Sequence, residues 1–275
     1  MAYRIKPSRL ALHLILFVTS FINIFPFIWL LLSSFKHNRD IITQTPTLFP
    51  VTWTLENYSL LSKAAPFLRF FLNSVIVSGV STLFILAGCS SMGYIFAKYN
   101  FRGMNFFFMM IIATILIPMY TYFIPMYLTI RALGWVNTYA GLIYPLIIMS
   151  SGIFFLRQTI SMIPNDLIDS SRIDGSSEFQ VYWHVIIPLS QSALAAIAIV
   201  NWVFTWSRFL WPLIVASSER LFTMEIGLAY FRRHFIVEYG GTMAACVVTL
   251  LPVLIVFLVF RTRIIEGIAF TGMKS

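Results

Sequence analysis

Six stretches of mostly apolar residues alternate with polar segments along the chain. A membrane-spanning helix needs about 20 predominantly apolar residues. The pattern predicts spans at residues 10–35, 70–97, 104–124, 138–155, 189–215 and 242–260. We therefore predict an all-α membrane protein with six transmembrane helices, organised as a single domain over residues 1–275.

The first apolar stretch follows a basic leader, yet we interpret it as a retained helix. Its apolar run exceeds the core of about 7–15 residues found in a signal peptide, and no small-x-small cleavage site follows it. Basic residues close to span ends favour the cytoplasm. The leader, the turn with Lys98 and Arg102, and the pair Arg261 and Arg263 would then share one side. We expect both termini in the cytoplasm.

Composition excludes a water-soluble domain and a disordered chain, because 59% of the 275 residues are hydrophobic and only 11% are charged. The net charge of +9 is scattered between apolar stretches. We interpret it as membrane topology and contact with lipid headgroups, not as a nucleic-acid surface. Cys89 and Cys246 lie inside apolar stretches, so we expect buried free thiols.

The predicted spans lack the groups that membrane chemistry requires. None carries Asp or Glu near its middle, where ion-coupled carriers and intramembrane enzymes usually place ionisable groups. No glycine precedes a lysine as in a phosphate-binding loop, and no two histidines are spaced i, i+4. We expect a chain that is not an enzyme and binds no metal or cofactor. A secondary carrier for a small polar solute remains the alternative function.

Small residues and prolines mark special positions within the spans. Gly93 and Ala97 are four residues apart and favour close approach of a second helix over pathway lining. Pro118 and Pro145 are predicted to interrupt the third and fourth helices, and Pro125 to mark the exit from the third.

The polar segment 157–188 has the pattern of a helix–turn–helix. The expected capping and turn residues are Asn165 or Asp166, Gly175, and Ser176 or Ser177. The second helix, expected to end at Pro188, carries an apolar stripe of Phe179, Trp183 and Ile186. On pattern alone, its apolar side is expected to pack on the protein's own helices or on lipid headgroups.

This loop resembles the EAA loop of inner-membrane permease subunits of ABC importers, in the sugar-uptake branch. The resemblance rests on Ile163-Pro164, Leu167, Ile173-Asp174-Gly175-Ser176 and Ile187-Pro188-Leu189. The Glu-Ala-Ala core appears here as Asp169-Ser170-Ser171. Further matching motifs follow in order: Ser34-Phe35-Lys36, Phe71-Leu72-Asn73-Ser74, Gly93-Tyr94, Leu156-Arg157-Gln158 and Phe209-Leu210-Trp211-Pro212-Leu213.

The resemblance implies a type I ABC importer permease in a bacterial inner membrane, of the kind that carries oligosaccharides or related polyols, including glycerol phosphate. It implies a second permease subunit, with a heterodimer favoured. It also implies an external solute-binding protein and two cytoplasmic ATPase subunits that bind ATP and Mg. The loop over residues 163–189 would couple this chain to the ATPases, and the tail over 267–275 would reach between them.

The resemblance also assigns candidate roles to single residues. The expected ATPase-coupling residues are Asp169, Ser170, Ser171, Asp174, Gly175, Phe179 and Trp183. In this hypothesis Asp169 pairs with a basic group of the ATPase and Gly175 allows the turn, while Phe179 and Trp183 support the loop.

Aromatic and neutral polar side chains in the third and fifth helices, with one in the second, form a candidate substrate pathway. They are Asn73, Tyr120, Tyr122, Asn201, Trp202 and Trp206. Helix packing is the alternative role for each. Where related chains often have Trp-Asn-Asp, this one has Trp206-Ser207-Arg208. Arg208 suits an anionic sugar or phosphate, although extension of its head to the membrane interface is the preferred interpretation.

Overall fold

A computed structural model describes residues 7–235 and 237–272, with side chains for residues 12–235 and 237–261. Every regular element in these residues is helical. The basic leader, Arg263 and the tail over 267–275 have side chains outside the described residues.

The principal helices are α1 (Pro7–Ser33), α2 (Asn38–Ile41), α3 (Glu56–Ala64), α4 (Phe67–Lys98), α5 (Met104–Ala113), α6 (Phe123–Ala132), α7 (Tyr139–Ile143), α8 (Ser150–Ser161), α9 (Asn165–Ile173), α10 (Glu178–Val181), α11 (Ile187–Leu189), α12 (Gln191–Trp206), α13 (Leu210–Val215), α14 (Met224–His234) and α15 (Tyr239–Gly272).

Three single helices and three bent pairs account for the six predicted spans. The single helices are long and apolar enough to cross a membrane alone: Leu12–Ser33 of α1, Phe67–Lys98 of α4 and Tyr239–Arg261 of α15. The bent pairs are Met104–Leu116 with Met119–Ala132, Tyr139–Leu146 with Ser150–Ser161, and Glu178–Leu189 with Gln191–Trp206, with bends of 99°, 48° and 76°. By length and composition, three helices of the described chain can each cross a membrane, and the number of candidate spans rises to six if each bent pair is one span.

Prolines explain two of the interruptions. Pro118 lies in the break before the short 3₁₀ turn Met119–Tyr122, and Pro145 lies in the 3₁₀ turn Tyr144–Leu146. Both predicted interruptions are therefore confirmed. The role predicted for Pro125 is wrong, because this residue lies in the first turn of α6 and so begins a helix. A proline is tolerated there because a first-turn N–H has no partner within the helix.

The chain divides into two compact units. The first comprises Met1–Leu68 and Gly227–Leu251, and the second comprises Arg69–Ile226 and Pro252–Ser275. In the first unit, the buried side chain of Asn57 donates to the backbone oxygens of Ser34 and Lys36, both at 2.8 Å. These bonds fix the start of the segment that follows α1.

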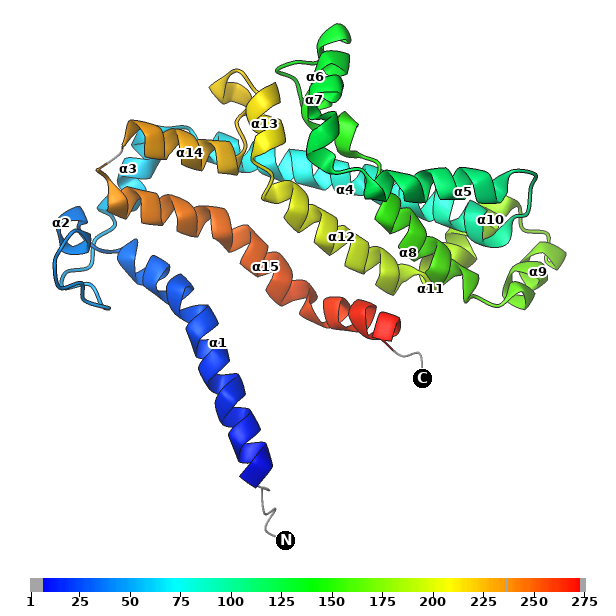
Figure 1. Cartoon of the computed structure of the whole chain (residues 1–275), viewed down its shortest axis with the longest axis horizontal. Helices are drawn as coiled ribbons and strands as arrows, with labels where there is room; N and C mark the ends of the chain where they lie inside the picture. The colour runs from blue at the N-terminus through cyan, green and yellow to red at the C-terminus, as the bar shows by residue number, and fades with distance from the viewer. Residues whose placement is uncertain (1–6, 236, 273–275) are drawn as a thin grey trace. The chain divides into compact units, whose positions relative to one another are not determined.

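The second unit contains two apolar cores. One joins α4, α5, α8, α9, α10 and α12 around the fully buried Leu156 and Ile160. The other joins α6, α7 and α13 around Leu142 and Val215. In Figure 1, α5 and α8 lie along the C-terminal half of α4. A Cβ atom at Gly93 would come within 2.9 Å of the Leu156 Cβ, so the close approach predicted at this glycine occurs, and α8 is the partner helix.

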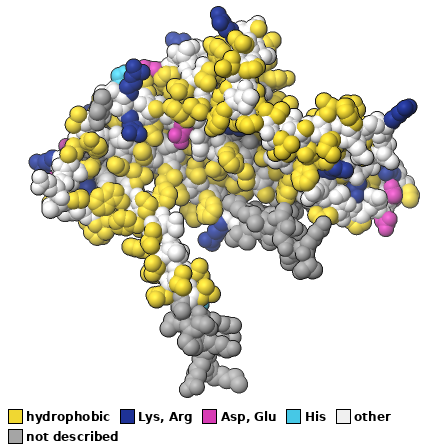
Figure 2. All heavy atoms as spheres, in the orientation of Figure 1, with side chains coloured by type: hydrophobic (Ala, Val, Ile, Leu, Met, Phe, Trp, Pro, Cys, Tyr) yellow, Lys and Arg dark blue, Asp and Glu magenta, His cyan; other side chains and the backbone are white. Residues whose placement is uncertain are grey.

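The surface of the molecule suits a lipid environment. Hydrophobic side chains cover much of the face drawn in Figure 2, with scattered charged groups between them. On α5, for example, Phe106 is 65% exposed and Met109 is 66% exposed. Apolar surface on this scale is rare on soluble monomers and is expected where acyl chains or partner helices cover it.

Candidate functional site

The loop that precedes α12 begins with a short helix that ends in a glycine turn. After α9, Gly175 has a φ of 88°, a left-handed conformation that glycine adopts without strain. Its N–H donates to the Arg172 oxygen and the Ser176 N–H donates to the Ser171 oxygen, each at 3.0 Å. This pair of bonds is a Schellman motif, and it satisfies carbonyls that the helix end leaves unpaired.

The second helix begins at a side-chain cap. Ser177 forms a capping box with Gln180, which selects Ser177 from the two predicted caps. The helix continues through a π-helical turn, Tyr182–Ile186, into α11. Pro188 is the second-last residue of this helical segment, which ends at Leu189 and bends by 76° before α12, so the predicted helix end at Pro188 is confirmed to within one residue. A widened turn accommodates a proline because the missing N–H breaks the regular hydrogen-bond pattern.

The predicted cap of the first helix is also wrong. Pro164 occupies the N-cap position of α9, with no side-chain cap bond. Asn165 instead accepts a hydrogen bond at 2.9 Å from Nζ of Lys98, the last residue of α4. Lys98 also donates to the Ile163 backbone oxygen. This lysine therefore ties the start of the loop to the end of α4.

Burial separates an inner from an outer side of the loop. Ile168, Val181 and Ile186 are at most 2% exposed and hold the two helices against the first core. The predicted coupling residues are almost all exposed, namely Asp169, Ser170, Asp174, Gly175, Phe179 and Trp183, and Ser171 is half-buried. Phe179 is 71% exposed, and its ring contacts that of Trp183 with centroids 6.1 Å apart, so the support that the two residues were predicted to give the loop stays a prediction.

An arginine joins the two helices of the loop. Arg172 donates from Nη1 to Asp169 Oδ1 at 3.0 Å, and from Nε and Nη2 to the two carboxylate oxygens of Glu178 at 2.8 and 3.2 Å. The predicted coupling residue Asp169 is thus paired inside the loop. Bidentate arginine–carboxylate pairs fix orientation as well as distance.

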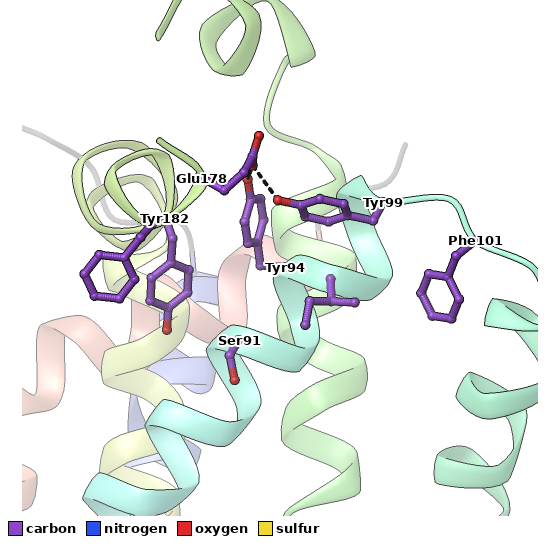
Figure 3. Close-up of a pocket in the computed structure, with 8 residues that line it drawn as sticks. Ser91, Tyr94, Tyr99, Phe101, Glu178 and Tyr182 are labelled. Carbon is purple, nitrogen blue, oxygen red and sulfur yellow. Dashed lines mark hydrogen bonds between the residues drawn. The ribbon is translucent and has the colours of Figure 1, made fainter. Parts of the chain in front are cut away.

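Glu178 also bonds to the end of α4. Tyr94 donates its hydroxyl to Glu178 Oε2 at 3.2 Å, and Tyr99 donates to the same oxygen. Figure 3 shows both phenols pointing toward the Glu178 carboxylate, with Tyr182 on the other side of the group. One carboxylate therefore connects α9, α10 and the C-terminal end of α4. We call Arg172, Glu178, Tyr94 and Tyr99 the loop clasp.

The clasp shifts the proton equilibria of Arg172 and Glu178, which lie in the polar loop ahead of α12. Hydrogen bonding by Arg172, followed by that of Tyr99, lowers the pKa of Glu178 from 4.5 to about 2. The same contact with Glu178 raises the pKa of Arg172. Glu178 is therefore ionised at any physiological pH, and the clasp is permanently charged.

A largely apolar cavity of about 410 Å³ lies beside the clasp. Phe101, Phe179 and Tyr182 line it together with the phenols of the clasp (Figure 3). Among the described residues, no three His, Cys, Asp or Glu side chains gather closely enough to hold a metal ion.

Two of the predicted pathway residues form hydrogen bonds with other helices and loops of the chain. Asn73 donates to the backbone oxygens of Arg220 and Phe222, both at 2.9 Å, and accepts from the Tyr139 hydroxyl at 2.6 Å. Asn201 donates to Thr82 Oγ1 at 2.9 Å. Both asparagines are buried and hold helices together, which is the role that the packing alternative gives them.

The four aromatic pathway residues form two separate groups. Trp202 and Trp206 stack on α12 with ring centroids 5.0 Å apart, and Trp202 lines a second cavity of about 240 Å³ beside Thr82. Tyr120 and Tyr122 lie at the break before α6, 68% and 40% exposed.

Sequence reasoning missed the loop clasp. Glu178 was visible only as the first residue of a helix, and its partners are distant in sequence, since Tyr94 and Tyr99 belong to the end of α4. No motif at fixed spacing connects them. The only usable signal was the arrangement of an arginine at the end of one predicted helix and an acid at the start of the next.

The fold and the exposed helix–turn–helix define a class: a multi-pass membrane permease with a docking loop. Residues 89–269 match the family described as binding-protein-dependent transport system inner membrane component. The chain belongs to this family. It is the permease subunit of an ATP-driven ABC importer, a non-catalytic membrane component that works with an ATPase and a solute-binding protein. This membership excludes the secondary-carrier alternative.

Curated relatives align over almost the full length of the chain. The arabinooligosaccharide transport system permease AraQ of Halalkalibacterium halodurans is 35% identical, with 93% of each chain covered. AraQ of Bacillus subtilis is 32% identical over 97% of this chain and 96% of its own. The sn-glycerol-3-phosphate transport system permease UgpE of Escherichia coli is 27% identical over 93% and 94%.

A solved structure shares the fold. It is a chain of a bacterial ABC transporter involved in the import of the acidic polysaccharide alginate, with a TM-score of 0.84 and 20% sequence identity. The match covers 95% of this chain and 99% of that chain. The type I permease fold predicted from the sequence is thereby confirmed.

Proposed function

We propose that the chain forms half of the translocation pathway for an oligosaccharide or related polyol, delivered by an external binding protein. A different permease subunit forms the other half. Two cytoplasmic ATPase subunits bind ATP and Mg and drive the cycle. The relatives named for arabinooligosaccharides and glycerol phosphate support this range of solutes. Both termini lie in the cytoplasm, on the side of the docking loop.

The observation that carries this proposal is the two-sided character of the loop. Its inner side is anchored to α4 and the first core by the clasp and by Ile168 and Val181. Its outer side presents small, acidic and apolar groups, with Ile173 86% exposed. Exposed apolar side chains next to a fixed charge are suited to a complementary groove on a partner protein.

Asp169 is central to the proposed coupling because it lies on the outer side, with a side chain 60% exposed. Its partner Arg172 uses its other donors on Glu178, so the free lone pairs of Asp169 remain available to a basic group of the ATPase. Reversal of this charge repels both Arg172 and the expected ATPase group.

The test is Asp169→Lys in the complete transporter, reconstituted with its second permease, ATPases and binding protein. We expect solute uptake to fall by about tenfold or more, which corresponds to about 1.4 kcal/mol of lost coupling. ATP hydrolysis should continue without response to the binding protein. Asp169→Asn should give an intermediate loss. Glu56→Lys is the control, because Glu56 is likewise an exposed acid, with a side chain 78% exposed, and it lies beside His37 at 3.3 Å. Unchanged uptake in Asp169→Lys contradicts the assignment.

A further inference from the structure

The stretch predicted as the fifth span, residues 189–215, contains a charged residue where its helix is interrupted. Helix α12 ends at Trp206, α13 begins at Leu210, and Arg208 lies between them. Irregular backbone at membrane depth is tolerated where protein buries it or where it lines a water-filled cavity. An ionisable residue in such a place usually marks a solute or ion pathway. The question is what neutralises this arginine.

The described part of the chain supplies no counter-charge. Nη1 of Arg208 is shielded from solvent and has no hydrogen-bond partner among the described residues. None of the ion pairs in this part of the chain includes Arg208. A guanidinium extended to the membrane interface would have its nitrogens in water or headgroups. Because Nη1 of Arg208 is shielded from solvent, its position disagrees with the interpretation preferred from the sequence, in which the guanidinium extends to the membrane interface.

The neighbouring ionisable group belongs to another helix break. Tyr122, in the turn that precedes α6, is close enough to act electrostatically on Arg208. Tyr122 and its neighbour Tyr120 are exposed, and neither hydroxyl has a hydrogen-bond partner among the described residues. Two interrupted helical segments thus bring together the guanidinium of Arg208 and the phenol of Tyr122.

We propose that Arg208 binds an anionic group of the transported solute, so that the solute is an acidic sugar bearing a carboxylate or phosphate. A guanidinium matches either oxyanion with two parallel N–H···O bonds. Tyr122 adds a hydroxyl donor beside it. This proposal rests on the proposed function and names the solute class for it.

A neutral sugar lacks the anionic group that would pair with Arg208 in this proposal. A hydroxyl-rich neutral solute leaves the positive charge uncompensated, and a site with a buried unpaired charge rejects such a solute. An acidic solute removes that penalty while it is bound. Arg208 is therefore a specificity-determining residue, and its contribution depends on the charge of the solute.

The test measures solute binding to the complete transporter in nanodiscs of phosphatidylcholine, which excludes anionic lipid as the ligand. The probes are a galacturonate trimer, glycerol 3-phosphate and the neutral galactose trimer, followed by tryptophan fluorescence. We expect at least one acidic probe to bind about tenfold more tightly than the neutral trimer. Arg208→Gln should abolish that preference, and Arg208→Lys should keep part of it.

Arg131→Gln is the control, because Arg131 is an exposed arginine of α6 in the same compact unit. The proposal is overturned if neither acidic probe binds better than the neutral trimer, or if Arg208→Gln weakens all three probes equally. A further outcome is that the two permeases dissociate in Arg208→Gln but not in Arg208→Lys. That result would identify an acidic residue of the second permease as the partner of Arg208 and would overturn the proposal. Coupled uptake of a neutral solute would leave the proposed importer function intact while removing this inference.

Discussion

Two arginines at interruptions of the helical chain have opposite surroundings. Arg172, at the end of α9, places three of its donors on the carboxylates of Asp169 and Glu178. Arg208, between α12 and α13, has no ion pair and a shielded Nη1 without a partner among the described residues. The exposed arginine is the saturated one, and the more buried arginine is the unsaturated one.

The contrast indicates different tasks. Exposed ion pairs contribute little stability, typically about 0.2–1 kcal/mol each, so the bonds of Arg172 matter chiefly for geometry. They hold the loop and the end of α4 as one piece that transmits displacement. A shielded charge without a partner is costly, which is why we propose that an acceptor from outside the chain pairs with Arg208. This contrast underlies both proposals, that the loop transmits motion and that Arg208 recognises an anionic group.

Loss of the clasp carboxylate is the largest effect that we expect. Glu178→Gln keeps the size of the side chain but removes the charge that Arg172, Tyr94 and Tyr99 share. The loop should still dock, because its outer side is unchanged, while displacement no longer reaches α4. We expect coupled uptake to fall about tenfold in proteoliposomes, equivalent to about 1.4 kcal/mol. ATPase binding, measured by co-purification, should remain.

Glu56→Gln is the matched control, because Glu56 is an exposed acid paired only with His37 at 3.3 Å.

A clasp that acts through its charge also has a defined pH dependence. Because the folded-state pKa of Glu178 is lowered from 4.5 to about 2, its stabilising contribution is complete above pH 4.5 and disappears as the pH falls toward 2. Pepsin cleavage of the loop should rise across that window in the native chain. Equal cleavage of the native chain and Glu178→Gln throughout the window contradicts the charge-based role.

A smaller effect is expected at the turn that sets the angle between α9 and α10. Gly175 has a φ of 88° and open space where a Cβ atom would lie, so Gly175→Ala adds backbone strain without a clash, about 1–2 kcal/mol. Gly134→Ala is a close control, since Gly134 has a φ of 71° and equally open space. Both variants should lose similar thermal stability, but only Gly175→Ala should reduce uptake per ATP hydrolysed. Equal uptake defects in the two variants would remove the loop geometry as the cause.

The sequence predicted the helical content, the interruptions at Pro118 and Pro145, and the glycine turn, because each depends on local chemistry. It failed at Pro125, which lies in the first turn of a helix and not at a helix end, whereas Pro188 ends its helical segment to within one residue. A proline signals an irregularity of the backbone, and its position relative to the preceding helix decides whether a helix begins, widens or stops. Tertiary packing makes that decision.

The candidate site was predictable on its outer side only. Acidic and small residues before a glycine carry the resemblance to the coupling loop, and the structure exposes them. The clasp depends on contacts with α4, which is distant in the sequence. Whether Arg208 forms an ion pair depends on which acidic side chains lie near it in the folded chain. Neither can be inferred from spacing along the chain, because both are properties of the assembled helices.

The smallest effect is expected at Asn201, which lies on α12, the helix that precedes Arg208. Unlike the shielded nitrogen of Arg208, the side chain of Asn201 has a hydrogen-bond partner. Its amide donates to Thr82 Oγ1 at 2.9 Å, and both residues are buried. Hydrogen bonds between membrane helices average about 0.6 kcal/mol, so Asn201→Ala and Thr82→Val should each reduce thermal stability slightly. The double variant should lose less than the sum, because one bond is removed twice. Solute preference between acidic and neutral probes should stay the same in all three. If Asn201→Ala instead changes that preference as strongly as Arg208→Gln, a satisfied side chain contributes to recognition, and the distinction between saturated packing groups and unsaturated ligand groups no longer holds for this permease.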